Sequence, residues 1–235
     1  MKSFRYALLT GLAAIFLAGC GALNALIPEI ELDDGAFGLG SNGTELSTTF
    51  SDSSNLSTQA ATGTFSHSGT FDDLTDDRIT GIQTLTTELT LKILSGSNNV
   101  LLLTRPTSGT YPATITITGA SATLNISDAS ESLSETFSAA QISISLNKDA
   151  SCTDDAAECG YGPSDDLSAA GLSLVPIAFN NQLASTLGTI MKEGGENTFS
   201  ASLSVTVSNN ASELAGATVS INLGEANSKV KVSAF

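Results

Sequence analysis

Apolar residues alternate with hydroxyl residues along most of this chain, and this period of two restricts the fold more than any other feature. Leu89, Leu91 and Ile93 stand at every second position, with threonine or a charged residue between them. The same period recurs in the runs 115–117, 124–126, 142–146, 199–207, 217–223 and 230–232. Because successive side chains of a β-strand point to opposite faces, each run predicts a strand with one apolar face and one hydroxyl face.

Clusters rich in Gly, Ser, Asn and Pro separate these runs, at 95–99, 106–109, 119–121, 208–212 and 224–228. Short alternating strands with such turns between them predict antiparallel sheets. We therefore expect an all-β fold, an antiparallel β-sandwich or barrel-like domain with one short helix, over residues 46–235. The pattern leaves open whether this region forms one β unit or two.

Two segments depart from the alternation. Residues 100–103 are continuously apolar, which predicts a strand buried on both faces. Residues 179–192 instead carry an apolar side chain at every fourth position, namely Leu183, Leu187 and Met191. Asparagines near the start of this segment and Gly194-Gly195 after its end predict a helix, and we expect the helix to close one end of the β core.

The first 20 residues have the order of an export signal. Lys2 and Arg5 precede a short apolar run from Tyr6 to Leu17, and small residues precede Cys20. The run is shorter than the roughly 20 apolar residues that a membrane-spanning helix needs. The motif Leu17-Ala18-Gly19-Cys20 resembles the lipobox of bacterial lipoproteins.

The resemblance implies that Cys20 receives a diacylglyceryl group, that residues 1–19 are removed as a signal peptide, and that the new amino terminus is acylated, for example with palmitate. Residues 20–45 are then expected to form a lipidated tether that holds the domain near a membrane. Gly21 and Ala22 follow the cysteine where many inner-membrane lipoproteins have aspartate. We therefore expect a cell-envelope protein, in the outer membrane if the source is Gram-negative.

The charge of the expected mature chain restricts its partners. Loss of Lys2 and Arg5 leaves seven basic residues against 24 acidic ones. Nucleic acid and anionic membrane surfaces would repel such a chain, so we expect no nucleic-acid partner. The membrane contact is expected to come from the lipid at Cys20, and an envelope protein is the expected partner of the domain.

Apart from Cys20, the chain has two cysteines, Cys152 and Cys159. An even pair in an exported protein predicts a disulfide, here closing a short acidic loop. A zinc site would need more soft ligands, and the one histidine, His67, is far away in sequence.

Acidic residues gather in one further stretch, formed by Asp72, Asp73, Asp76 and Asp77. Calcium binds six to eight oxygen ligands, and carboxylates on a loop can supply several of them. The spacing does not follow the EF-hand pattern, and adjacent acids are commonly just hydrated. Calcium at these four residues is a hypothesis, and no other cofactor is expected.

The sequence offers little for catalysis, so no enzymatic activity is expected. A serine triad would have to use His67, and no G-x-S-x-G motif is present. Ser145 and Lys148 match S-x-x-K, but they stand at the end of an alternating run, where the two side chains point to opposite faces.

Two functions then remain. The first is a structural or protein-interaction module of the cell envelope, with contacts made by loops; the loop 149–166 is the leading candidate, through Tyr161, Asp165 and Asp166. The second is a carrier or assembly factor that binds an apolar ligand between its sheets. A carrier needs an apolar cavity of roughly several hundred Å³, whereas an interaction module needs only a packed core.

Overall fold

The computed structural model describes residues 28–40, 43–50, 60–71, 73, 78–94, 97–139, 141–165, 167, 170–192, 196–208 and 211–234. These residues form an all-β fold, as expected, in which one antiparallel sheet contains 12 strands. The strands are β1 (Ile30–Glu31), β2 (Thr44–Thr49), β3 (Ala61–Phe71), β4 (Ile79–Lys92), β5 (Leu101–Thr104), β6 (Thr114–Ser127), β7 (Ser132–Ser138), β8 (Ile144–Lys148), β9 (Glu158–Gly162), β10 (Leu172–Phe179), β11 (Asn197–Val207) and β12 (Thr218–Ala234). Two helices are α2 (Asn181–Ile190) and α3 (Ala211–Leu214).

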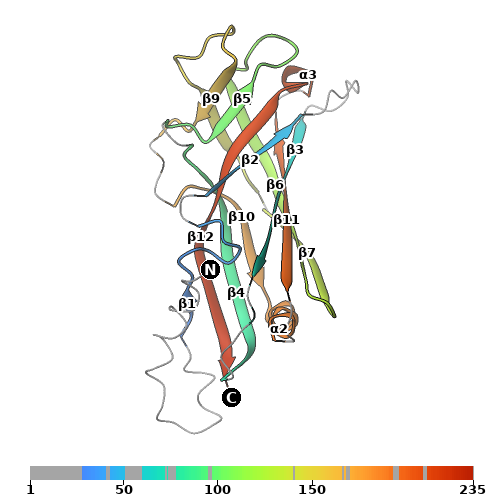
Figure 1. The fold of residues 1–235 in the computed structure, drawn as a ribbon. Helices are drawn as coiled ribbons and strands as arrows, with labels where there is room; N and C mark the ends of the chain where they lie inside the picture. The colour runs from blue at the N-terminus through green and yellow to red at the C-terminus, as the bar shows by residue number, and fades with distance from the viewer. Residues whose placement is uncertain are drawn as a thin grey trace.

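The longest strand, β12, organises the first half of the sheet (Figure 1). On one side it pairs with β4 and then, toward its start, with β5. On its other side it pairs with β1 and then with β2. β10 lies outside β4. After β1 the chain leaves the sheet over residues 32–40, opposite the middle of β12.

β6 organises the second half in the same way. β11 lies on one side of β6, with β3 outside it, and β8 and then β7 lie on the other side. The strands β5, β9 and β8 join the two halves at one end. Figure 1 shows the halves as two layers that spread apart from this end, with α2 between their far ends.

The core lies between the two layers, as the alternation predicts. Leu85, Leu89 and Leu91 of β4 are buried, as are Leu203 and Val205 of β11 in the facing layer. On β6 and its neighbours, exposed serines and threonines of the outer face hydrogen-bond across strands, for example Thr123 to Thr136 at 2.9 Å and Ser127 to Thr198 at 3.1 Å. In the continuous apolar run 100–103, three of the four side chains are buried and that of Leu102 is half-buried.

The expected helix is present as α2. The side chain of Asn180 accepts hydrogen bonds from the backbone amides of Gln182 and Leu183, both at 3.0 Å, and so caps the first turn. The side of α2 that faces β4 and the core is buried and carries Ala184, Leu187, Gly188 and Ile190. The helix therefore closes the far end of the space between the layers, as the sequence predicted (Figure 1).

The expected boundary of the tether at residue 45 is wrong. β1 pairs with β12 through Ile30 and Val230, and β2 pairs with β12 from Thr44 onward. Between these strands, Phe37 and Leu39 are buried with exposed fractions of 8% and 5%. The domain thus begins by residue 30, because apolar side chains fix this stretch to the core.

Two of the expected turns do not separate strands: β6 runs through residues 119–121, and residues 224–228 lie within β12. β12 continues through them, and the irregularity is absorbed by a register shift against β4 between Ala226 and Lys229. Asn227 adopts a positive φ of 56° there, a conformation that asparagine tolerates better than most residues. The turn-forming residues therefore make a bulge within one strand.

Several predicted residues lie outside the described part of the chain: Cys20 with the rest of the leader, Asp72, Asp76, Asp77 and Asp166. Within the described part, no helix has both the length and the apolar character that spanning a bilayer requires.

Candidate functional site

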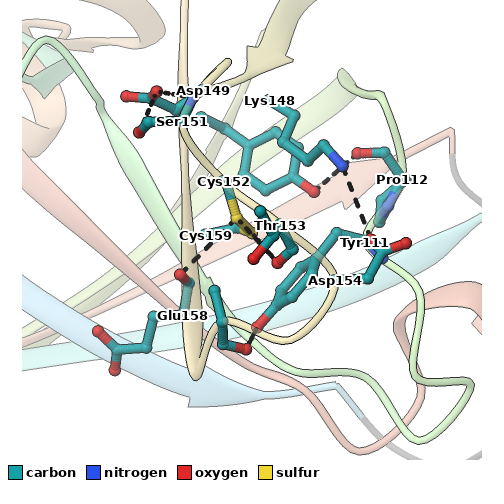
Figure 2. Close-up of a disulfide and its surroundings, with 12 residues drawn as sticks. Tyr111, Pro112, Lys148, Asp149, Ser151, Cys152, Thr153, Asp154, Glu158 and Cys159 are labelled. Atoms are coloured by element: carbon teal, nitrogen blue, oxygen red, sulfur yellow. Dashed lines mark hydrogen bonds and ion pairs between the residues drawn. A yellow bond between two sulfur atoms is a disulfide. The ribbon is translucent and has the colours of Figure 1, made fainter.

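Cys152 and Cys159 form a disulfide, as the sequence predicted (Figure 2). Their Cα atoms are 5.6 Å apart. The turn before the bond is held by Asp149, whose carboxylate accepts hydrogen bonds from the backbone amide and the hydroxyl of Ser151, each at 2.8 Å. These two donors lower the pKa of Asp149. The disulfide therefore cross-links a loop that local hydrogen bonds also hold in place.

We expect the double variant Cys152→Ser, Cys159→Ser to lose about 2–3 kcal/mol of unfolding free energy, because the cross-link restricts the unfolded chain. Urea unfolding followed by circular dichroism measures this loss. Reduced wild-type protein is the matched control and should unfold at the same urea concentration as the variant. Alkylation of both cysteines in denatured, unreduced protein would contradict the disulfide itself.

Tyr161 is not the surface contact that we expected. It lies in β9 between β5 and β8, its side chain is fully buried, and its hydroxyl donates to the carbonyl of Pro112 at 2.8 Å. Burial raises the pKa of Tyr161. Because side chains alternate along β9, that of Tyr161 points into the core. It therefore holds the loop to the core and is not available to a partner.

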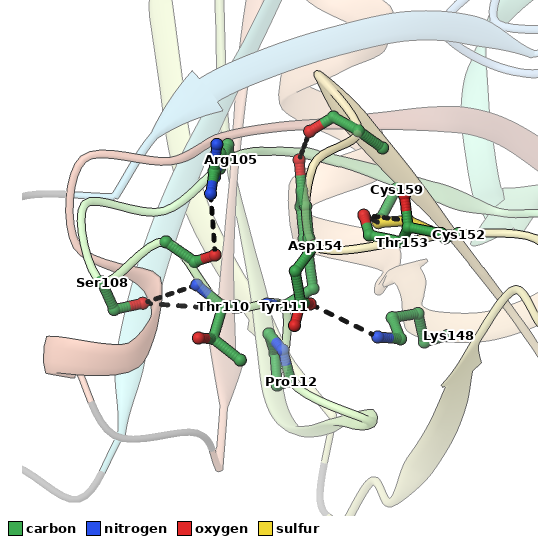
Figure 3. Close-up of polar contacts among 12 residues, drawn as sticks. Arg105, Ser108, Thr110, Tyr111, Pro112, Lys148, Cys152, Thr153, Asp154 and Cys159 are labelled. Carbon is green, nitrogen blue, oxygen red and sulfur yellow. Dashed lines mark hydrogen bonds and ion pairs between the residues drawn. A yellow bond between two sulfur atoms is a disulfide. The ribbon is translucent and has the colours of Figure 1, made fainter.

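The rest of the loop is bound to the segment before β6 (Figure 3). Asp154 accepts a hydrogen bond from the backbone amide of Tyr111 at 3.3 Å and lies 3.7 Å from the ammonium group of Lys148. The Tyr111 hydroxyl donates to the carbonyl of Ala156 at 3.0 Å. Of the predicted contact residues, Asp165 alone is described and exposed. The described part of this loop is thus held to the segment before β6 by hydrogen bonds and an ion pair.

The calcium hypothesis rests on four residues of which Asp73 alone is described. One oxygen of its carboxylate accepts a hydrogen bond at 2.6 Å from the side-chain amide of Asn197, a buried residue at the start of β11. Among the described residues, no group of three or more potential metal ligands occurs. Calcium at this loop remains a prediction.

A different polar site lies in the middle of β12. Glu225 is only 5% exposed, and its carboxylate is surrounded by donors from residues 32–40, which we name the strap. The backbone amide of Ala36 donates at 2.8 Å, that of Phe37 at 3.0 Å and that of Leu39 at 3.1 Å. The hydroxyl of Thr87 on β4 adds a fourth donor at 3.0 Å. Burial raises the pKa of Glu225, and the hydrogen bonds oppose this shift.

The backbone of the strap is shaped to wrap this carboxylate. Gly35 and Gly38 adopt φ values of +76° and +74°, which residues with a Cβ rarely take. A Cβ on Gly35 would also overlap the Glu225 carboxylate. The amides of the strap therefore converge on one acceptor because glycines allow the chain to turn around it.

The strap also fills the space between the two layers. The ring of Phe37 lies 6.0 Å from that of Phe199 on β11, measured between ring centroids. Phe37 and Leu39 line a cavity of about 10 Å³, roughly the room for one water molecule. It is lined by side chains from both layers, among them Phe65, Leu89, Leu124, Leu203 and Leu223. The strap thus spans from β12 in one layer to β11 in the other.

Sequence reasoning missed this site, although its glycines were visible within the expected tether. The signal was Phe37 and Leu39 two positions apart between Gly35, Gly38 and Gly40, a pattern unlike that of a flexible linker. The partner, Glu225, lies about 190 positions further on, within a run that we had assigned to a turn.

No protein-family model, curated protein or solved structure shows a significant match to this chain.

Proposed function

We propose that this chain is a lipid-anchored protein-interaction module of the cell envelope. The observation that carries the proposal is the packing between the layers in the described part of the chain: Phe37 and Leu39 of the strap are buried there, and the cavity that they line is about 10 Å³. A carrier of apolar ligands needs a cavity of several hundred Å³. A packed core with polar outer faces suits a domain that makes its contacts through its surface.

Anchoring follows from the leader, whose motif Leu17-Ala18-Gly19-Cys20 resembles a lipobox. With lipid on Cys20, two or more acyl chains would hold the protein on the membrane, since one chain gives only marginal binding. The domain begins by residue 30, so at most about ten residues separate it from the lipid. The domain would therefore stay within roughly 35 Å of the membrane surface.

We expect the variant Cys20→Ala to lose fatty-acid labelling and membrane association in cells, because the thiol that carries the lipid is gone. The measurement is metabolic labelling with a radioactive fatty acid, followed by membrane fractionation. A Cys152→Ser, Cys159→Ser variant is the control and should keep its label. Equal labelling of Cys20→Ala and wild type would refute the anchor.

The interaction part of the proposal is tested by cross-linking the tagged full-length protein in its native envelope and identifying what copurifies. We expect a specific envelope protein to copurify. Recovery of bound lipid without any protein partner would instead support the carrier.

A further inference from the structure

The strap is bound to the domain in the manner of a peptide ligand. Its amides donate to Glu225, the amide of Leu32 donates to the carbonyl of Ser228 at 2.8 Å, and the carbonyl of Gly40 accepts from the amide of Glu225 at 3.3 Å. Two side chains, Phe37 and Leu39, enter the core two positions apart. An extended peptide uses the same two elements, backbone hydrogen bonds and pockets for alternate side chains, when it binds to a sheet.

The position of the strap on β12 strengthens this comparison. β2 pairs with β12 as far as Leu223, and β1 pairs with it again from Lys229. In the described structure, residues 224–228 have no strand partner on that side and face the strap instead. The middle of β12 is thus a stretch of sheet edge between two paired stretches, and a loop of the same chain covers it.

We propose that the strap occupies, within its own chain, a binding site for an extended segment of another protein that carries two apolar side chains two residues apart. This inference rests on the proposed interaction function and specifies its partner. The strap holds the site closed, and an incoming segment takes the places of Phe37 and Leu39 and donates its own amides to Glu225.

Glu225 selects a peptide over a lipid at this site. An acyl chain could fill the volume of Phe37 and Leu39, but it has no N–H groups. Displacing the strap by an acyl chain would leave a buried carboxylate without the amide donors that now surround it, which is strongly unfavourable. A peptide backbone supplies these donors.

The test uses the full-length variant Phe37→Ser, Leu39→Ser, in which the strap loses its hold on the core while Glu225 is kept. A fluorescent peptide with the sequence of residues 30–40 is titrated against it and followed by fluorescence polarisation. We expect this variant to bind the peptide at least tenfold more tightly than wild type does. A peptide with serine at the two apolar positions should not bind, and adding Glu225→Gln to the variant should weaken binding at least tenfold.

A second measurement needs no variant. Excess peptide added to wild-type protein should raise hydrogen exchange at the amides of Ala36, Phe37 and Leu39, because it displaces the strap. Decanoate is the comparison. The proposal is overturned if the peptide neither binds the folded variant nor speeds this exchange, if the serine peptide binds equally well, or if decanoate releases the strap as effectively. Capture of an envelope protein by cross-linking does not require displacement of the strap, so the interaction function and this inference fail separately.

Discussion

The variant Glu225→Ala is expected to lose about 3–5 kcal/mol of unfolding free energy, because it leaves several donors without their acceptor. The amides of Phe37 and Leu39 are buried, and each unpaired buried donor costs about 1–3 kcal/mol. Urea unfolding gives the total loss. Amide hydrogen exchange should be fastest in residues 32–40, because release of the strap would let the unpaired amides bind water.

Glu45→Ala is the matched control, because Glu45 is an exposed glutamate on β2 close to the same site. We expect it to change stability by no more than about 0.5 kcal/mol. Equal losses for the two variants, or exchange that rises evenly over the whole domain, would show that the carboxylate does not hold the strap.

Phe65→Ala is expected to cost about 3–5 kcal/mol, the usual loss for a large aromatic side chain removed from a core. Phe65 is 2% exposed and lines the small cavity next to the strap, so removal of its ring would enlarge that cavity. Phe71→Ala on the same strand is the control. Phe71 is only half-buried, and we expect at most half the loss.

The measurement is the urea midpoint at constant slope, which separates a change in stability from a change in the unfolded state. A loss for Phe71→Ala as large as that for Phe65→Ala would contradict the placement of the core between the two layers.

The fold class could be read from the sequence because one physical rule determines it. A strand buried on one face must alternate, so the run 199–207 identified β11 and the placement of its inward side chains. The helix α2 was equally clear, since a period of four, a capping asparagine and two following glycines agree with one another. The disulfide followed from the count of cysteines and the expected compartment.

The strap and Glu225 could not be found in this way. Their relation depends on how β1 and β2 pair with β12, and register between strands far apart in sequence is not written in local periodicity. The prediction for Tyr161 was wrong for a related reason. A tyrosine between two glycines in a polar stretch resembles part of a loop, but the pairing of β9 with β5 and β8 places it in the core.

The position of β12 in the chain also restricts when the protein can fold. It follows the other strands in sequence, yet β1, β2, β4 and β5 all pair with it. A ribosome therefore releases the strand on which half of the sheet is assembled only after all the others. Until then β1 and β2 lack the strand with which they pair, so this half of the sheet can form only late, and folding through such distant contacts is slow.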